Sequence, residues 1–94
     1  MISLTLENMD SEFKNILKGK LDFLLDKAPS DSTLSSQVSK IKNAYEGAIE
    51  IVSTQGKFLS RSMSKDPNEL VFDLVDDIYK QILNWRNRRI LLLQ

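Results

Sequence analysis

The stretch from Asp66 to Leu93 constrains the fold of this chain more than any other. Asp66 is a residue type that caps helices, Pro67 takes the first helical position, and Glu69 stands three residues after the cap. Apolar residues then recur at helical spacing and form one stripe: Val71, Leu74, Val75, Ile78, Ile82 and Trp85. The pattern predicts a long helix over residues 67–93.

The predicted terminal helix changes from acidic to basic along its length, which suits the helix dipole at both ends. Arginines near an aromatic residue are typical of phosphate contacts and of interface hot spots, although a solvated helix end explains them equally well. The apolar tail over residues 90–93 would expose apolar surface unless it docks into a groove, meets a partner or continues into further chain. The residues that we predict to bind a partner are Arg86, Arg88, Arg89, Ile90, Leu91, Leu92 and Leu93.

Two further helices are predicted upstream of the terminal one. The first covers about residues 11–27, where Phe13, Ile16, Leu17, Leu21, Leu24 and Leu25 fall on one broad face. A loop rich in proline, serine and aspartate follows. The second helix covers about residues 33–62 and has a heptad-like seam: Leu34, Val38, Ile41, Tyr45, Ala48, Val52 and Leu59. Gly47 and Gly56 weaken it, since glycine costs about 1 kcal/mol in a helix.

The N-terminal segment alternates, with Ile2, Leu4 and Leu6 on one side. Alternation of this kind is typical of a β-strand. Because no other strand is predicted with which it would pair, we expect an extended arm over a helix or a first helical turn.

The sequence therefore predicts an all-α fold. Residues 1–94 form a single helical domain, a small bundle of three main helices over about 11–27, 33–62 and 67–93. A short turn joins the two long helices, so we expect a long antiparallel helical hairpin that dominates the bundle.

The composition excludes several classes of site. The chain has no cysteine and no histidine, which removes disulfides, thiolate metal sites and the commonest general base. The acidic cluster Asp73, Asp76 and Asp77 has no accompanying phosphate loop, so we interpret it as a solvated helix face rather than a metal site. We expect no catalytic residue, no metal and no cofactor, and hence a protein that is not an enzyme.

Charge and hydropathy limit the partners. Thirteen basic and thirteen acidic residues cancel, so we expect no strong binding to nucleic acid alone. The N-terminus has no basic region followed by an apolar run, and no stretch approaches the roughly 20 apolar residues of a membrane span. We expect a soluble protein of the cytoplasm, without membrane binding.

The C-terminal half resembles the helical domain of GINS subunits, a scaffold of archaeal and eukaryotic DNA replication. Tyr45 matches an aromatic that opens a long helix, and the stretch 65–67 matches a short acidic turn. The residues that match the Arg-Ile signature and the positions preceding it are Tyr79, Ile82, Arg86, Arg89 and Ile90. The resemblance covers residues 45–93, but the chain ends where the small β-rich domain of that family would begin.

This resemblance implies a non-enzymatic, protein-binding subunit of a DNA replication complex, a scaffold or adaptor between helicase, polymerase or primase. Its partners would be larger replication proteins. The alternative is a small helical immunity protein or secretion chaperone that binds a single protein partner. A homodimer through the heptad-like seam is a third reading.

Overall fold

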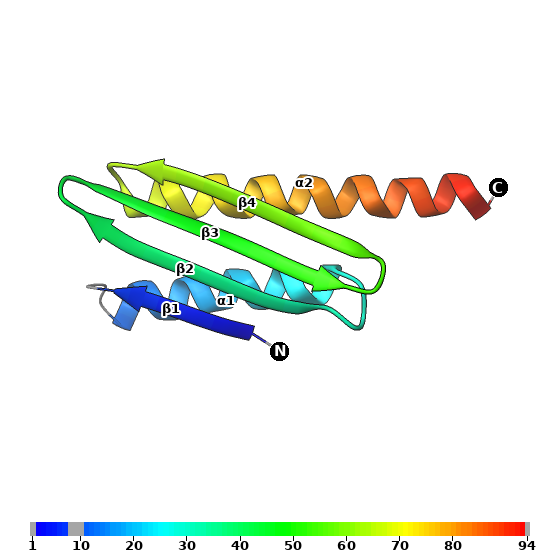
Figure 1. Cartoon of the computed structure of the whole chain (residues 1–94), viewed down its shortest axis with the longest axis horizontal. Helices are drawn as coiled ribbons and strands as arrows, with labels where there is room; N and C mark the ends of the chain where they lie inside the picture. The colour runs from blue at the N-terminus through cyan, green and yellow to red at the C-terminus, as the bar shows by residue number, and fades with distance from the viewer. Residues whose placement is uncertain (1, 8–10, 94) are drawn as a thin grey trace.

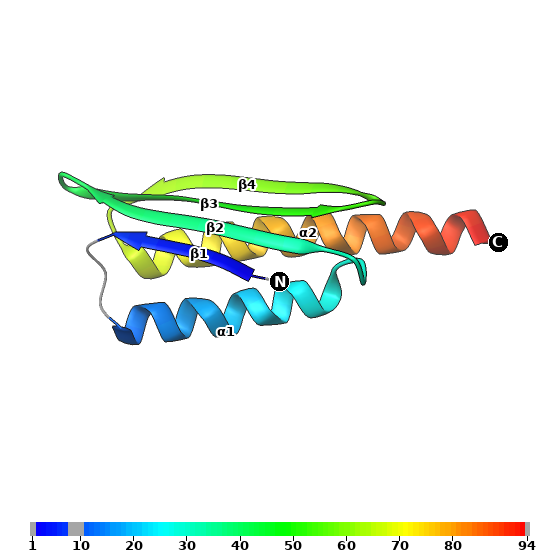
Figure 2. The same ribbon diagram turned by 60° about the horizontal axis from the view of Figure 1, so that its bottom comes forward.

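Two helices lie side by side on one face of a four-stranded β-sheet (Figure 1), and Figure 2 shows both helices beneath the sheet. This computed structural model describes the backbone of residues 2–7 and 11–93 and the side chains of residues 11–88. The elements in chain order are β1 (Ile2–Glu7), α1 (Ser11–Lys27), β2 (Thr33–Ile41), β3 (Ala44–Ser53), β4 (Gly56–Ser64) and α2 (Pro67–Leu93).

The strands follow one another across the sheet in the order β1-β2-β3-β4. β2, β3 and β4 form an antiparallel meander, in which Ser36, Ile49 and Ser60 lie opposite one another. β1 pairs with β2 in parallel, and a parallel pair needs a crossover, which α1 provides. The N-terminal alternation therefore is a strand, and the expected arm or helical turn is wrong.

The all-α prediction is wrong, because residues 33–62 form three strands instead of one helix. The heptad-like seam splits between the two faces of the sheet. Leu34 and Val38 are buried between the sheet and the helices, whereas Ile41, Val52 and Leu59 are 45%, 42% and 40% exposed. Alternation of side chains along a strand, not the helical period, decides which face each residue occupies. The long helical hairpin does not exist, and the fold is α+β.

The helices over residues 11–27 and 67–93 have the same bounds in the structure as in the sequence prediction. The Asp66 carboxylate accepts the Asn68 N–H at 2.9 Å, and the Asp66 carbonyl accepts the Leu70 N–H at 3.0 Å. The first bond satisfies a backbone donor that a helix start leaves unpaired, and the second is the first hydrogen bond of the helix itself. The cap predicted at Asp66 is therefore present.

One apolar core fills the space between the helices and the sheet. Its fully buried members come from both helices and from two strands, β2 and β3: Leu17, Leu21, Leu24, Leu34, Val38, Ile49, Ile51, Leu70, Leu74, Ile78 and Ile82. Burying a side chain of this size stabilises the fold by about 1.5–3 kcal/mol relative to exposure. The stripe predicted on the terminal helix faces this core, with Val75 and Trp85 half-buried at its margin.

The Leu74 side chain of α2 packs close to Gly47 in β3. A Cβ atom at this position would lie 3.0 Å from the Leu74 side chain and 3.1 Å from the Gln37 carbonyl. Neither neighbour can move away freely, since one is a core side chain and the other is backbone in β2. The glycine that weakened the helical prediction here permits a helix to cross a strand.

We expect Gly47→Val to lower the free energy of unfolding by about 1–3 kcal/mol, because the added methyl groups overpack this crossing. The matched control is Gly19→Ala in α1, where an added Cβ meets nothing within 4 Å. This control should raise the free energy of unfolding by about 1 kcal/mol. Denaturant unfolding followed by circular dichroism measures both variants. Equal stability of Gly47→Val and the parent chain would contradict the packing described.

Candidate functional site

The sheet face opposite the helices carries a cross-strand row of polar and small side chains. Gln37, Ala48 and Arg61 lie opposite one another on β2, β3 and β4. The neighbours of this row on the buried face are Ser36, Ile49 and Ser60, so alternation turns the row toward solvent. Because Ala48 is small, the side chain in the middle of the row projects less far from the sheet than the side chains at its two ends.

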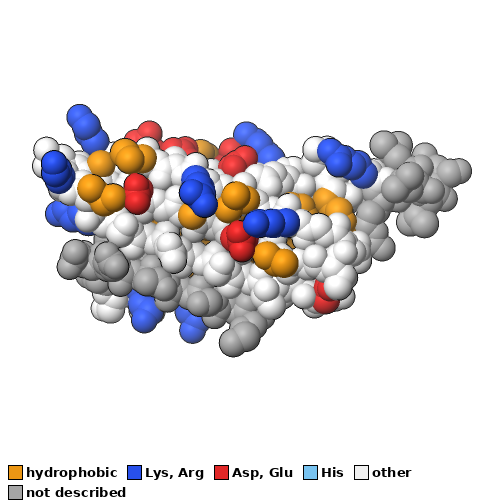
Figure 3. All heavy atoms as spheres, in the orientation of Figure 1, with side chains coloured by type: hydrophobic (Ala, Val, Ile, Leu, Met, Phe, Trp, Pro, Cys, Tyr) orange, Lys and Arg blue, Asp and Glu red, His pale blue; other side chains and the backbone are white. Residues whose placement is uncertain are grey.

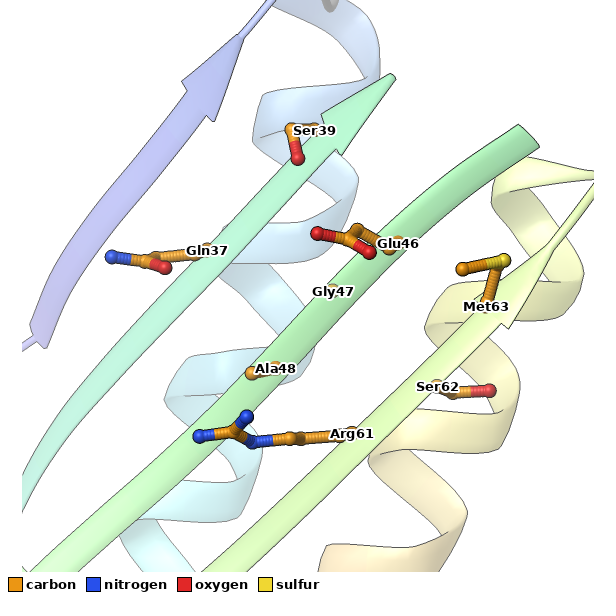
Figure 4. Close-up of a pocket in the computed structure, with 8 residues that line it drawn as sticks. All are labelled: Gln37, Ser39, Glu46, Gly47, Ala48, Arg61, Ser62 and Met63. Atoms are coloured by element: carbon orange, nitrogen blue, oxygen red, sulfur yellow. The ribbon is translucent and has the colours of Figure 1, made fainter. Parts of the chain in front are cut away.

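A shallow hollow of about 480 Å³ lies over this part of the sheet. A second hollow of about 220 Å³ adjoins it and shares Gln37, Ala48 and Arg61. Figure 4 shows the Arg61 side chain reaching from β4 across β3, beside Ala48. The guanidinium therefore lies over the floor of the hollow, where it offers several N–H donors in one plane.

Positive charge predominates along these three strands. The segment 33–65 has five cationic and two anionic residues, a surplus of three positive charges in a chain of zero net charge. Glu50 is already paired with Lys57, at 3.1 Å. Within the described side chains no ion pair involves Arg61. Basic and acidic side chains both lie on this face among apolar patches (Figure 3), and Glu46 lines the larger hollow together with Arg61.

The predicted partner-binding arginines lie in the C-terminal part of α2, where Arg88 is beside the β3–β4 turn. The end of α2 extends past the sheet (Figure 1). Arg86 and Arg88 are exposed, and they lie two residues apart, so they point to different sides of the helix. The Arg89 side chain and those of the tail, residues 90–93, lie outside the described side chains, although their backbone continues the helix. Partner binding by these residues stays a prediction.

The acidic cluster of α2 makes local contacts on the helix. Asp76 forms a salt bridge with Lys80, with 2.8 Å between the carboxylate Oδ2 and the lysine Nζ. The hydrogen bond to Asp76 raises the pKa of Lys80. Asp77 accepts a hydrogen bond from Gln81 at 3.3 Å. Among the residues that the structure describes, no group of three or more acidic, histidine or cysteine side chains is placed to hold a metal ion.

The sequence prediction missed Gln37, Ala48 and Arg61 as cross-strand neighbours, because it placed all three on one long helix. Two signals for strands were present in the sequence. Residues 49–54, IEIVST, are rich in β-branched side chains, and Gly56 follows directly after a polar pair. Gly56 has φ +147°, a conformation that an L-residue rarely adopts and that the β3–β4 turn requires.

The β3–β4 turn is fastened to the loop that precedes β2. The Asp31 carboxylate accepts the Thr54 hydroxyl at 2.6 Å and the Thr54 N–H at 2.9 Å. The Thr54 hydroxyl, and then the Thr54 N–H, lower the pKa of Asp31 below its ordinary value of 3.8. The turn is therefore held at the end of the sheet where α2 emerges.

Two solved structures share this fold over nearly their whole length. The N-terminal domain of Thermus thermophilus Protein Y aligns with a TM-score of 0.75 and 14% identity, covering 88% of this chain and 94% of that one. A ribosomal subunit interface protein from Coxiella burnetii aligns with a TM-score of 0.67 and 12% identity, covering 92% of this chain and 97% of that one. The sequence matches no protein-family model and no curated protein.

These findings overturn the resemblance to GINS subunits. The resemblance needed a helical hairpin over residues 45–93, but Tyr45 lies in β3 and residues 56–64 form β4. The DNA replication scaffold and its replication partners are therefore wrong. The immunity-protein and secretion-chaperone alternative is wrong too, since it rested on the same helical form and the structural neighbours are of another kind.

The structure bears on one part of the membrane prediction, the absence of a membrane-spanning segment. In the described part of the chain no helix has the length and apolar character needed to cross a membrane.

The Asp31 contact predicts a pH effect at the β3–β4 turn. A carboxylate whose pKa is lowered on folding stabilises the fold above its unfolded pKa, and this contribution disappears as the pH falls through the folded pKa. We therefore expect the turn to loosen only below pH 3.8. The NMR shift of the Thr54 amide should titrate with a midpoint below 3.8, and Asp31→Asn should abolish that titration. A midpoint at or above 3.8 would show that the bond does not form.

Proposed function

We propose that this protein binds the ribosome. The observation that carries the proposal is the fold match over 97% of a ribosomal subunit interface protein, which leaves almost no part of that chain without a counterpart here. The match to the Protein Y domain supports the same fold at a TM-score of 0.75. As part of this proposal the protein acts by binding in the cytoplasm and performs no catalysis, in keeping with the lack of histidine and cysteine.

The end of α2 supplies the first proposed contact. Arg86 and Arg88 are exposed near the end of a helix that extends past the sheet (Figure 1), so a large partner can reach both side chains. Guanidinium groups bind phosphate oxygens in a bidentate fashion, and ribosomal RNA offers phosphates over much of its surface. These arginines are therefore suited to anchor the protein on RNA.

The exposed sheet face supplies the second proposed contact. Arg61 lies across the hollow on this face, and the adjoining Glu50 carboxylate is already engaged by Lys57. The surplus of three positive charges in segment 33–65 offsets acidic residues elsewhere, which is why the net charge gives no sign of it. Zero net charge limits the long-range electrostatic attraction of the protein to RNA, whereas short-range contacts depend on these local groups.

A sedimentation experiment tests the proposal. Purified bacterial ribosomes should pellet the parent protein stoichiometrically through a sucrose cushion. Arg86→Glu with Arg88→Glu should weaken binding by about tenfold or more, since two phosphate contacts become repulsive. Arg61→Glu should weaken it by a smaller factor.

The matched control reverses two charges on the opposite layer of the molecule. Lys14 and Lys18 are exposed on α1, and Lys14→Glu with Lys18→Glu should change ribosome binding by less than about twofold. Parent protein that stays in the supernatant with intact ribosomes would refute ribosome binding. Loss of binding in the α1 control alone would keep the ribosome as partner and refute the proposed contact surface.

A further inference from the structure

A separate cleft lies between the β3–β4 turn and α2. Its volume is about 280 Å³, and it lies at the end of the sheet where α2 emerges. The side chains that matter for its chemistry are Lys57, Phe58, Gln81, Asn84, Trp85 and Arg88. The cleft shares no lining residue with the two hollows around Arg61, so it is distinct from them.

An aromatic wall forms one side of this cleft. Trp85 is half-buried and packs edge-on against Phe58, with ring centroids 6.3 Å apart and an interplanar angle of 78°. This packing fixes the plane of the indole, since Phe58 is itself buried in the core. A flat aromatic surface held in this way suits stacking by another flat ring.

Cationic side chains reach the cleft from two different elements. Lys57 comes from the start of β4 and keeps 58% of its side chain exposed while it pairs with Glu50. Arg88 comes from α2 and is exposed. Lys57 and Arg88 thus line one small cleft from different elements, and the guanidinium, for which no ion pair is found among the described side chains, favours phosphate.

The remaining walls are held rigid. The Gln81 carboxamide accepts the Leu59 N–H at 3.2 Å and donates to the Leu59 carbonyl at 2.9 Å, so it ties α2 to the edge of β4. The turn on the other side is fastened by Asp31 and Thr54. Binding to a cleft with fixed walls loses less conformational entropy than binding to mobile loops.

We propose that this cleft binds a nucleoside phosphate, with the base stacked on Trp85 and the phosphate between Lys57 and Arg88. Asn84 is exposed beside the indole and supplies both a donor and an acceptor for a base edge. The same chemistry occurs in a free nucleotide and in one unit of a single-stranded RNA. The inference does not depend on ribosome binding.

The chain carries its own reporter for this site, because Trp85 is its single tryptophan. AMP and a single-stranded oligo(A) RNA are titrated separately into the protein, with corrections for absorbed light. Saturable quenching of the indole emission by AMP would support a free-nucleotide site. Saturable quenching by oligo(A) alone would support a site for one unit of an RNA strand.

Two variants decide whether the quenching comes from this cleft. Lys57→Ala with Arg88→Ala should raise the dissociation constant by about tenfold or more. The matched control is Lys14→Ala with Lys18→Ala on α1, which removes the same two charges from side chains that do not line the cleft, and it should leave the constant within about twofold. All four side chains are exposed, and circular dichroism checks that the variants fold.

Two outcomes would overturn the proposal. One is the absence of saturable quenching by either ligand, and the other is equal weakening by the cleft variant and the α1 control. Sedimentation with ribosomes is measured on the same proteins. Intact sedimentation without nucleotide binding removes the cleft proposal alone, and nucleotide binding without sedimentation removes the ribosome proposal alone.

Discussion

The packing of the apolar stripe of α2 against β3 and β4 holds this fold together. Leu70, Leu74, Ile78 and Ile82 are fully buried along one side of the helix, and Gly47 lets the helix approach the sheet. Gln81 adds polar contacts to the outer edge of β4, which would otherwise offer unpaired backbone groups to another strand. Because α2 is longer than the strands it covers, this packing also carries its arginine-rich end past the sheet (Figure 1).

The sequence predicted the helices well and the strands badly, for a physical reason. Residues 67–93 have a cap, a first-turn proline and an apolar period that only a helix satisfies. Residues 33–62 satisfy two patterns, since Leu34 and Val38 are four apart and share a face on a helix and on a strand alike. The exposed face of the strands also carries Ile41, Val52 and Leu59, which obscures the alternation and imitates a heptad.

The residues of the candidate site also fall into those that the sequence predicted and those that it did not. Arg86 and Arg88 were predicted because they lie close together in the sequence, and the structure places them on an exposed helix end. The row that contains Gln37 and Arg61 was not predictable without the strand register, because its members come from three different strands. Lys57 and Arg88 are 31 positions apart in the sequence, and only the path of α2 past the β3–β4 turn brings them to one cleft.

Charge segregation links the fold to the proposed function. A chain with as many acids as bases still presents a basic sheet segment and a basic helix end, while acidic residues occupy the first half of α2. The same fold occurs in a ribosomal subunit interface protein at 12% identity, so the fold is shared although the side chains on its surface have largely changed. What this chain binds therefore depends on the contacts that its own surface side chains make.

A cryo-EM map of bacterial ribosomes saturated with this protein tests the central claim most directly. The account predicts density for two helices on a four-stranded sheet, with Arg86, Arg88 and the exposed sheet face turned toward ribosomal RNA. A map without such density would contradict ribosome binding. A map in which α1 faces the RNA and the sheet faces solvent would keep the ribosome as partner and contradict the contact surface derived from the structure.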